Sequence, residues 1–110
     1  MKPKRIGRAD LFGIKNNKLI LLEMKSITSN NERKQIRSAI GQLWDYEFLE
    51  FEKYRKTHKI IKAVALEKKP SNKIIEWLKY SGMLIYWIDN KNNIEGEEES
   101  LNYLKKLYTT

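Results

Sequence analysis

The fold of this chain is decided by one predicted hairpin, whose sequence is Arg8-Ala9-Asp10-Leu11-Phe12-Gly13-Ile14-Lys15-Asn16-Asn17-Lys18-Leu19-Ile20-Leu21-Leu22-Glu23-Met24-Lys25. Both arms are rich in apolar residues, and paired asparagines readily take the positive φ angles that a two-residue hairpin turn requires. With Asn16 and Asn17 as the turn, Lys15 lies opposite Lys18 and the register of the two arms follows by counting outward. The arms are therefore predicted to be neighbouring antiparallel strands of a buried sheet.

The same register brings two carboxylates together. Ile14 lies opposite Leu19, Phe12 opposite Leu21, Asp10 opposite Glu23 and Arg8 opposite Lys25, all on one face of the sheet. Like charges directly opposite each other destabilise a strand pair, which makes sense if a divalent cation normally lies between Asp10 and Glu23. The alternative is a solvated cluster of charged side chains that pair with one another at the end of the sheet.

The order of these residues resembles a known family. Asp10, followed after one strand by Glu23-Met24-Lys25, is similar to the motif of the PD-(D/E)XK nuclease superfamily, which has the restriction-endonuclease-like fold. The stretch Gln42-Leu43-Trp44-Asp45-Tyr46 resembles the Q-x-x-x-Y helix motif of its RecB-like branch, and the combination is more specific than either motif alone. Ala9 stands where the name of the superfamily has proline. Since only six residues precede Gly7, near which the first arm begins, we expect the usual N-terminal helix and first strand to be missing.

This resemblance implies a metal-dependent nuclease that hydrolyses DNA phosphodiester bonds. By resemblance, Asp10, Glu23 and Lys25 are the catalytic residues, and Asp10 and Glu23 are also ligands of Mg²⁺ or Mn²⁺. The backbone carbonyl of Met24 would be a further ligand, and Lys25 would orient or help deprotonate the attacking water. Magnesium prefers such hard oxygen ligands and usually keeps several waters.

The predicted nucleic-acid-binding residues lie mostly on the helix after the hairpin. Gln42 and Tyr46 are four residues apart and share a helix face, which in the RecB-like branch reaches toward the site and the DNA backbone. The alternative is a core aromatic at Tyr46 and a surface residue at Gln42. The other candidates are basic, and they are Arg8, Arg33, Lys34 and Arg37. These side chains could contact phosphates, or equally form a solvated face.

Length and charge favour one nucleic-acid-binding domain. A chain of 110 residues is long enough for a single core, so we expect one nuclease domain over residues 1–110, minimal or partial. Its 22 Lys and Arg against 14 Asp and Glu give a net charge of +8, which favours DNA, or less strongly RNA, over a membrane surface. With no signal peptide evident, the expected location is the cytoplasm, in a bacterium or as a phage-encoded protein. The absence of cysteine excludes disulfides and thiolate metal sites.

The rest of the chain predicts an α/β fold with a mixed sheet flanked by helices. A helix is expected to open with a capping box at Ser29 and Glu32 and to run toward Thr57, which is long enough to hide a break. The expected elements after it are a strand over 59–66 parallel to the Glu23 strand, a helix from Pro70-Ser71 to Gly82, a strand over 83–88, a polar turn region over 89–96 and a helix from Glu97. The three tryptophans are expected in the core or at an interface.

Two functions remain open at this stage. The first is the Mg²⁺-dependent nuclease, and the second is a non-catalytic nucleic-acid-binding or assembly subunit that keeps the fold. A hairpin with no strand before it would expose an apolar sheet edge, and such edges are normally paired or covered. We therefore expect a homodimer, or a partner chain, that completes the edge.

Overall fold

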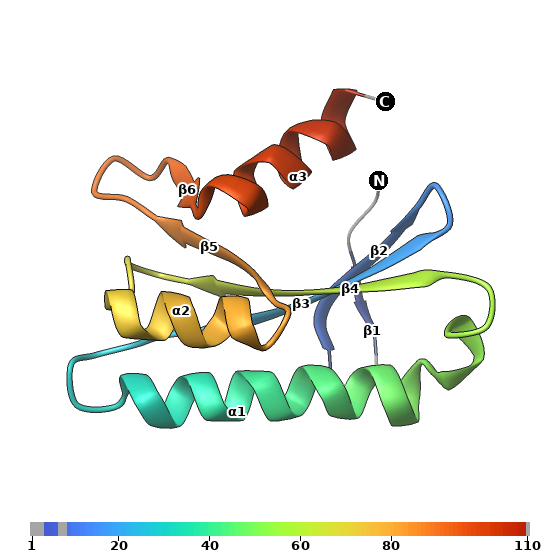
Figure 1. The fold of residues 1–110 in the computed structure, drawn as a ribbon, viewed down its shortest axis with the longest axis horizontal. Coiled ribbons are helices and arrows are strands. Elements are labelled where there is room, and N and C mark those ends of the chain that lie inside the picture. The colour runs from blue at the N-terminus through green and yellow to red at the C-terminus, as the bar shows by residue number, and fades with distance from the viewer. Residues whose placement is uncertain (1–3, 7–8, 110) are drawn as a thin grey trace.

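A computed structural model describes the backbone of residues 4–6 and 9–109, and the side chains of residues 13–107. The chain forms one mixed sheet with helices on both faces (Figure 1). The strands follow the chain order across the sheet: β1 (Lys4–Ile6), β2 (Ala9–Lys15), β3 (Lys18–Lys25), β4 (Lys59–Leu66), β5 (Leu84–Ile88) and β6 (Ile94–Gly96). The helices are α1 (Glu32–Asp45) and α2 (Asn72–Tyr80) on one face, and α3 (Glu98–Thr109) on the other.

The hairpin of β2 and β3 has the predicted turn and register. Asn16 and Asn17 have φ angles of 53° and 62°, and Lys15 pairs with Lys18. The ladder continues outward to Leu11 and Leu22. The predicted turn and the predicted register as far as Leu11 and Leu22 are therefore confirmed.

The expectation that no strand precedes the hairpin is wrong. β1 pairs with β2 in antiparallel orientation, and the register shifts between Lys4 and Ile6. This three-residue strand occupies the sheet edge that was expected to be open, so the structure removes the reason for expecting a partner there. A short, irregular edge strand is one of the ways in which proteins prevent edge-to-edge pairing.

The helix after the hairpin ends earlier than its apolar spacing suggested. α1 stops at Asp45, a π-helical turn follows over Tyr46–Glu50, and a 3₁₀ turn over Glu52–Tyr54 leads to β4. The expected break therefore falls at the tyrosine of the Q-x-x-x-Y motif. Beyond it, β4 is parallel to β3 along its whole length, as predicted.

The predicted capping box at the start of α1 is wrong. Asn31 precedes the helix without capping it, because its side chain accepts a hydrogen bond from the Thr28 amide at 2.7 Å instead. Glu32 does not fold back onto its own helix. Its carboxylate accepts hydrogen bonds from the backbone amide and the hydroxyl of Ser71, at 2.9 and 2.8 Å. Glu32 thus connects the start of α1 to the start of α2.

In the second half of the chain, the two ends of α2 lie where the sequence predicted them, and one predicted turn region contains a strand. Ser71 caps α2 by accepting from the Ile74 amide, and Gly82 ends the helix with a φ of 78°. The region over 89–96 was expected to be only a turn, but it contains β6, which pairs with β5. The Asp89 carboxylate shapes the connection, since it accepts from the amides of Asn93 and Lys91, and these bonds lower its pKa.

The core lies between the sheet and the helices α1 and α2. It is built from apolar residues of both layers: Leu19, Leu21, Ile36, Leu43, Val64, Ile74, Leu78 and Ile85. Trp77 and Trp87 pack against this core, as predicted. Trp44 does not belong to it, because 48% of its surface is exposed.

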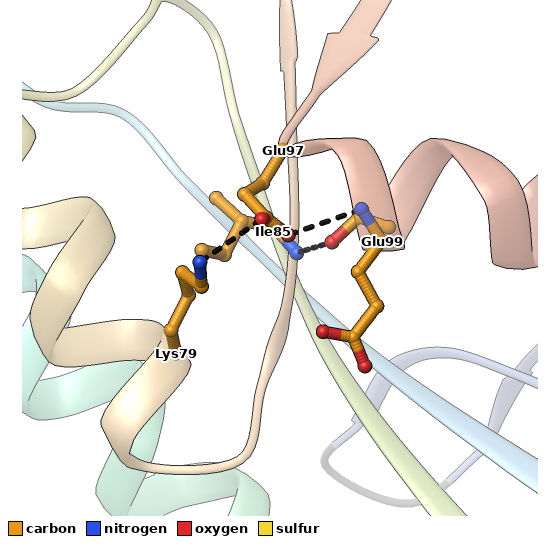
Figure 2. A network of polar contacts seen from close by, with 5 residues as sticks. Lys79, Ile85, Glu97 and Glu99 are labelled. Carbon is orange, nitrogen blue, oxygen red and sulfur yellow. Dashed lines mark hydrogen bonds and ion pairs between the residues drawn. The ribbon is translucent and has the colours of Figure 1, made fainter.

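The start of α3 is held against the sheet by a group of polar contacts (Figure 2). Glu97 pairs with Lys79 of α2 at 3.0 Å and also accepts from the Glu99 amide at 3.2 Å. The buried hydroxyl of Ser100 accepts from the Ile85 amide of β5 at 2.8 Å. These contacts fix the end of α3 that lies over β5 and β6. Within residues 4–6 and 9–109, no helix is long and apolar enough to cross a membrane.

Candidate active site

Alternation along β3 sends two charged residues toward α1. Successive side chains of a strand point to opposite faces, so Glu23 and Lys25 share the face of Leu19 and Leu21, which are fully buried. Glu23 is only 3% exposed and Lys25 is half-buried. A buried carboxylate is costly unless it is hydrogen-bonded.

The Glu23 carboxylate is met by the tyrosine of the helix motif. The Tyr46 hydroxyl donates a hydrogen bond to Oε2 of Glu23 at 2.9 Å, and the Tyr46 side chain is itself 2% exposed. Tyr46 is therefore a core aromatic, and its hydroxyl also bonds to Glu23. The role of Tyr46 in binding nucleic acid stays a prediction. The hairpin motif and the helix motif meet at this bond.

Lys25 is connected to the same helix through Ser38, which was not among the predicted site residues. Its ammonium group donates to the Ser38 hydroxyl at 3.4 Å, and this hydroxyl lies 3.5 Å from Oε1 of Gln42. Ser38, Gln42 and Tyr46 are spaced four apart, so they lie on one face of α1 and of the π-helical turn that continues it. This spacing could have indicated Ser38 as a further residue of the candidate site. Gln42 is half-buried, and it lies beside the site and not on the open surface.

A π-helical turn begins where two adjacent residues, Tyr46 and Glu47, both contact the sheet. Such turns are wider than α-helical ones and often occur at functional sites, and this one begins at Tyr46 with a bond from the Phe51 amide to its carbonyl at 2.8 Å. Glu47, the next residue, pairs with Lys62 of β4. The Lys62 ammonium lies 3.9 Å from the centre of the Trp44 ring. Trp44, expected in the core or at an interface, thus covers a buried cation next to the site.

Other predicted residues are not brought to this point. Arg33, Lys34 and Arg37 are exposed on the first turns of α1. None of the three bonds to Glu23 or Lys25 within the described part of the chain. The Met24 side chain is 52% exposed and, by strand alternation, points to the opposite face of the sheet. Only its backbone carbonyl was predicted to act as a ligand.

For two predicted residues, Asp10 and Arg8, the structure does not describe the side chain. Asp10 belongs to β2, one residue beyond the last ladder pair of Leu11 and Leu22, but its side chain is outside the described residues. Arg8 is outside them altogether. Among the side chains of residues 13–107 there is no group of three or more acids or histidines that could hold a metal ion. The assignment of Asp10, Glu23 and Met24 as metal ligands therefore stays a prediction.

Comparisons of the chain with protein-family models, with curated proteins and with solved structures find no match.

Proposed function

We propose that the chain is a metal-dependent nuclease that hydrolyses DNA phosphodiester bonds, with Asp10, Glu23 and Lys25 as its catalytic residues and a restriction-endonuclease-like fold. The observation that carries the proposal is the hydrogen bond of 2.9 Å between the Tyr46 hydroxyl and the Glu23 carboxylate. It joins the two motifs on which the resemblance rests, although they are separated by 23 residues along the chain. A core with no functional constraint has little reason to bury a carboxylate against a tyrosine.

The residues near Glu23 suit a hard divalent cation such as Mg²⁺ or Mn²⁺. Asp10 and Glu23 would provide carboxylate oxygens from neighbouring strands and Met24 a backbone carbonyl, which are ligand types that Mg²⁺ prefers. When bound, the metal would supply a lower pKa for its water and a counter-charge for the phosphate. Tyr46 would orient the Glu23 carboxylate, as residues that bond to metal ligands commonly do. Lys25, held near Ser38, would position the attacking water.

The positive charge of the chain supports a polyanionic substrate. The net charge is +8, and Arg33, Lys34 and Arg37 project from the exposed first turns of the helix that carries Ser38, Gln42 and Tyr46. In this proposal they contact phosphates without reading the base sequence. DNA is the proposed substrate, and RNA is the weaker choice.

One observation favours the non-catalytic alternative. Glu23 is 3% exposed, whereas a magnesium ion in an active site usually keeps several waters. A nucleic-acid-binding or assembly subunit that retains the fold would tolerate a Glu23 side chain that is buried away from water.

Cleavage of plasmid and single-stranded DNA, with Mg²⁺ or Mn²⁺ and with EDTA, tests the proposal. We expect metal-dependent cleavage by the purified chain that is abolished in Glu23→Ala and in Lys25→Ala, since each removes a separate part of the site. Lys73→Ala, an exposed lysine of α2 on the outer surface, is the matched control and should cleave normally. DNA binding without cleavage under every metal condition would favour the alternative, and equal cleavage by all variants would refute the site.

A further inference from the structure

Exposed apolar side chains gather where α1 passes into its π-helical turn. Trp44 is 48% exposed, Phe48 59% and Leu49 68%. The helix that carries them forms an outer layer of the molecule beside the sheet (Figure 1). Isolated apolar residues on a surface are ordinary, whereas clustered ones mark interaction surfaces.

The spacing along α1 places basic residues and a glycine on the same side as these aromatic rings. Arg37, Gly41 and Trp44 follow one another at intervals of four and three residues, which define one face of a helix, and Phe48 comes four residues after Trp44. Lys34 lies on this face three residues before Arg37, and all five side chains or positions are exposed. This outer face of α1 therefore has a basic end and an aromatic end.

The cations of the basic end are placed against the helix dipole. The N-terminal end of a helix carries a partial positive charge, so cations are unfavourable there. Among the described side chains, no carboxylate forms an ion pair with Arg33, Lys34 or Arg37. Glu32, the acid of the first turn, is bonded to Ser71 instead. A bound anion would offset this unfavourable arrangement of charge.

Each exposed ring of the aromatic end lies against a cation. The Lys62 ammonium is 3.9 Å from the centre of the Trp44 ring, and the Arg55 guanidinium is 4.4 Å from the centre of the Phe48 ring. Arg55 also donates to the Phe48 carbonyl at 3.4 Å. Rings that are held in this way lose less conformational entropy when a planar group stacks on them.

The charge near the rings favours unpaired bases over a duplex. The two cations that hold the rings are themselves paired with Glu47 and Glu52, and Asp45 and Glu50 lie in the same turns. Acidic side chains repel the closely spaced phosphates of a duplex, whereas an uncharged base stacks on any accessible aromatic ring.

Gly41 leaves the helix backbone bare between the two ends. A Cβ atom there would have no neighbour within 4 Å, so packing within the described part of the chain does not require a glycine, which destabilises a helix interior. Close approach of a ligand to the backbone is one reason for glycine at such a position. Ser38, which contacts Lys25, precedes Gly41 by three residues. A strand that lies across Gly41 would therefore connect the aromatic end with the candidate site.

We propose that the outer face of α1 binds single-stranded DNA, with bases stacked on Trp44 and Phe48 and phosphates next to Lys34 and Arg37. This inference rests on the proposed function, because it specifies the substrate of that site as a single strand. A second copy of the chain is the other partner that an exposed apolar patch would suit, and the cations of the basic end favour nucleic acid over it.

Fluorescence anisotropy of end-labelled oligothymidylate, titrated with the full chain in EDTA, measures the binding without cleavage. The duplex of the same length is the comparison. We expect the single strand to bind at least about tenfold more tightly than the duplex, because only its bases are free to stack. Binding should also quench tryptophan fluorescence through Trp44, since Trp77 and Trp87 pack against the core.

Three substitutions test the parts of the surface separately. Trp44→Leu should weaken single-strand binding at least about fivefold and remove the quenching. Arg37→Gln should reduce the slope of log Kd against log salt concentration by about 0.7, the value for one phosphate contact on a single strand. Gly41→Leu should weaken binding and yet raise Tm, because leucine favours a helix but covers the bare backbone. Tyr80→Leu, which changes a 93% exposed aromatic residue of α2, is the matched control and should bind as the wild type does.

Three results would overturn the inference. The first is duplex binding as tight as single-strand binding, and the second is a folded Trp44→Leu variant that binds the single strand as the wild type does. The third is a wild type that is dimeric by light scattering and becomes monomeric in Trp44→Leu, since a second copy would then cover this face.

Failure of the nuclease proposal gives a different result. A chain that binds the single strand as expected but cleaves no DNA with any metal would support the stacking surface and contradict the nuclease alone. A chain that cleaves DNA with Mg²⁺ but binds duplex and single strand equally would contradict the stacking surface alone.

Discussion

At the scale of single residues, the contact between Tyr46 and Glu23 dominates the candidate site. Glu23 is one of the few buried charged residues among the described side chains, and Tyr46 donates to it from a position that is equally buried. Hydrogen bonds to charged groups contribute more to stability than neutral ones, particularly away from water. The same bond therefore bears on both the stability of the fold and the position of the proposed ligand.

We predict that Tyr46→Phe lowers the free energy of unfolding by about 1.5 to 3 kcal/mol, because it removes a donor from a buried carboxylate. It should also reduce cleavage without abolishing it, since Glu23 and Lys25 remain. Urea denaturation measures the first effect. Tyr80→Phe is the matched control, because Tyr80 is 93% exposed, and it should change stability little. A Tyr46→Phe variant as stable as the control would show that the bond contributes nothing.

Two glycines allow a paired test of local packing. A Cβ atom on Gly96 would lie 2.6 Å from the carbonyl oxygen of Ile85, which is backbone and cannot turn away, whereas one on Gly41 of α1 would have no neighbour within 4 Å. We predict that Gly96→Ala lowers the free energy of unfolding by about 1 to 3 kcal/mol, as overpacking does. Gly41→Ala should raise it by about 0.5 to 1 kcal/mol, because alanine favours a helix interior. Thermal melts that moved in the same direction would contradict this difference.

At the scale of elements, α1 links the two halves of the structure. Its first residue, Glu32, holds the N-cap serine of α2, its middle carries Ser38 and Gln42, and its π-helical end presents Tyr46 to β3 and Glu47 to β4. The helix thus positions the candidate site and also connects α2 to the hairpin.

We predict that Glu32→Ala lowers the free energy of unfolding by about 0.5 to 2 kcal/mol, the range observed when helix N-caps are lost. Both of its acceptor contacts to Ser71 disappear, and with them the connection between α1 and α2. Glu76→Ala is the control, because Glu76 is an exposed acid of α2 whose contact is an i,i+3 pair with Lys73. Denaturation midpoints that are equal for the two variants would rule out the role given to Glu32.

At the scale of the whole molecule, the two faces of the sheet differ. The face covered by α1 and α2 carries the buried acid and its motif residues, while the face under α3 carries an apolar groove, which Met24 and Lys25 also line. Metal binding can be measured through the stability of the entire domain, because a metal ion that binds only the folded state raises the free energy of unfolding.

We predict that Mg²⁺ at ten times its Kd stabilises the wild type by about 1.4 kcal/mol, which follows from linkage. For a domain of this size that is several degrees in Tm. Asp10→Asn should lose most of this gain. Without metal, it should be as stable as the wild type or slightly more so, because opposed carboxylates repel.

Thermal melts of both proteins with and without Mg²⁺ check this prediction. If magnesium raises Tm equally in both, Asp10 is not a ligand. If the variant melts well below the wild type in the absence of metal, Asp10 belongs to a cluster of paired charges and not to a metal site.

Much of the fold was predictable from short-range chemistry. Asn16 and Asn17 determine the hairpin turn because they tolerate positive φ angles, and the period of two then sets the register as far as Leu11 and Leu22. Ser71 and Gly82 mark the two ends of α2 for similarly local reasons. The convergence of Tyr46 on Glu23 agrees with the motif spacing, although a family resemblance and not periodicity suggested it.

Only the tertiary structure decided the features that depend on distant partners. β6 is three residues long and too short for any periodic signal, and it exists because β5 offers it a neighbour. Glu32 was predicted to form a capping box with Ser29. Its carboxylate instead accepts a hydrogen bond from the hydroxyl of Ser71, which is 39 residues away. Trp44 lies outside the core, with its ring 3.9 Å from the ammonium group of the buried Lys62. In each case the local sequence permits several conformations of similar free energy, and a contact that forms only when the chain is folded selects one of them.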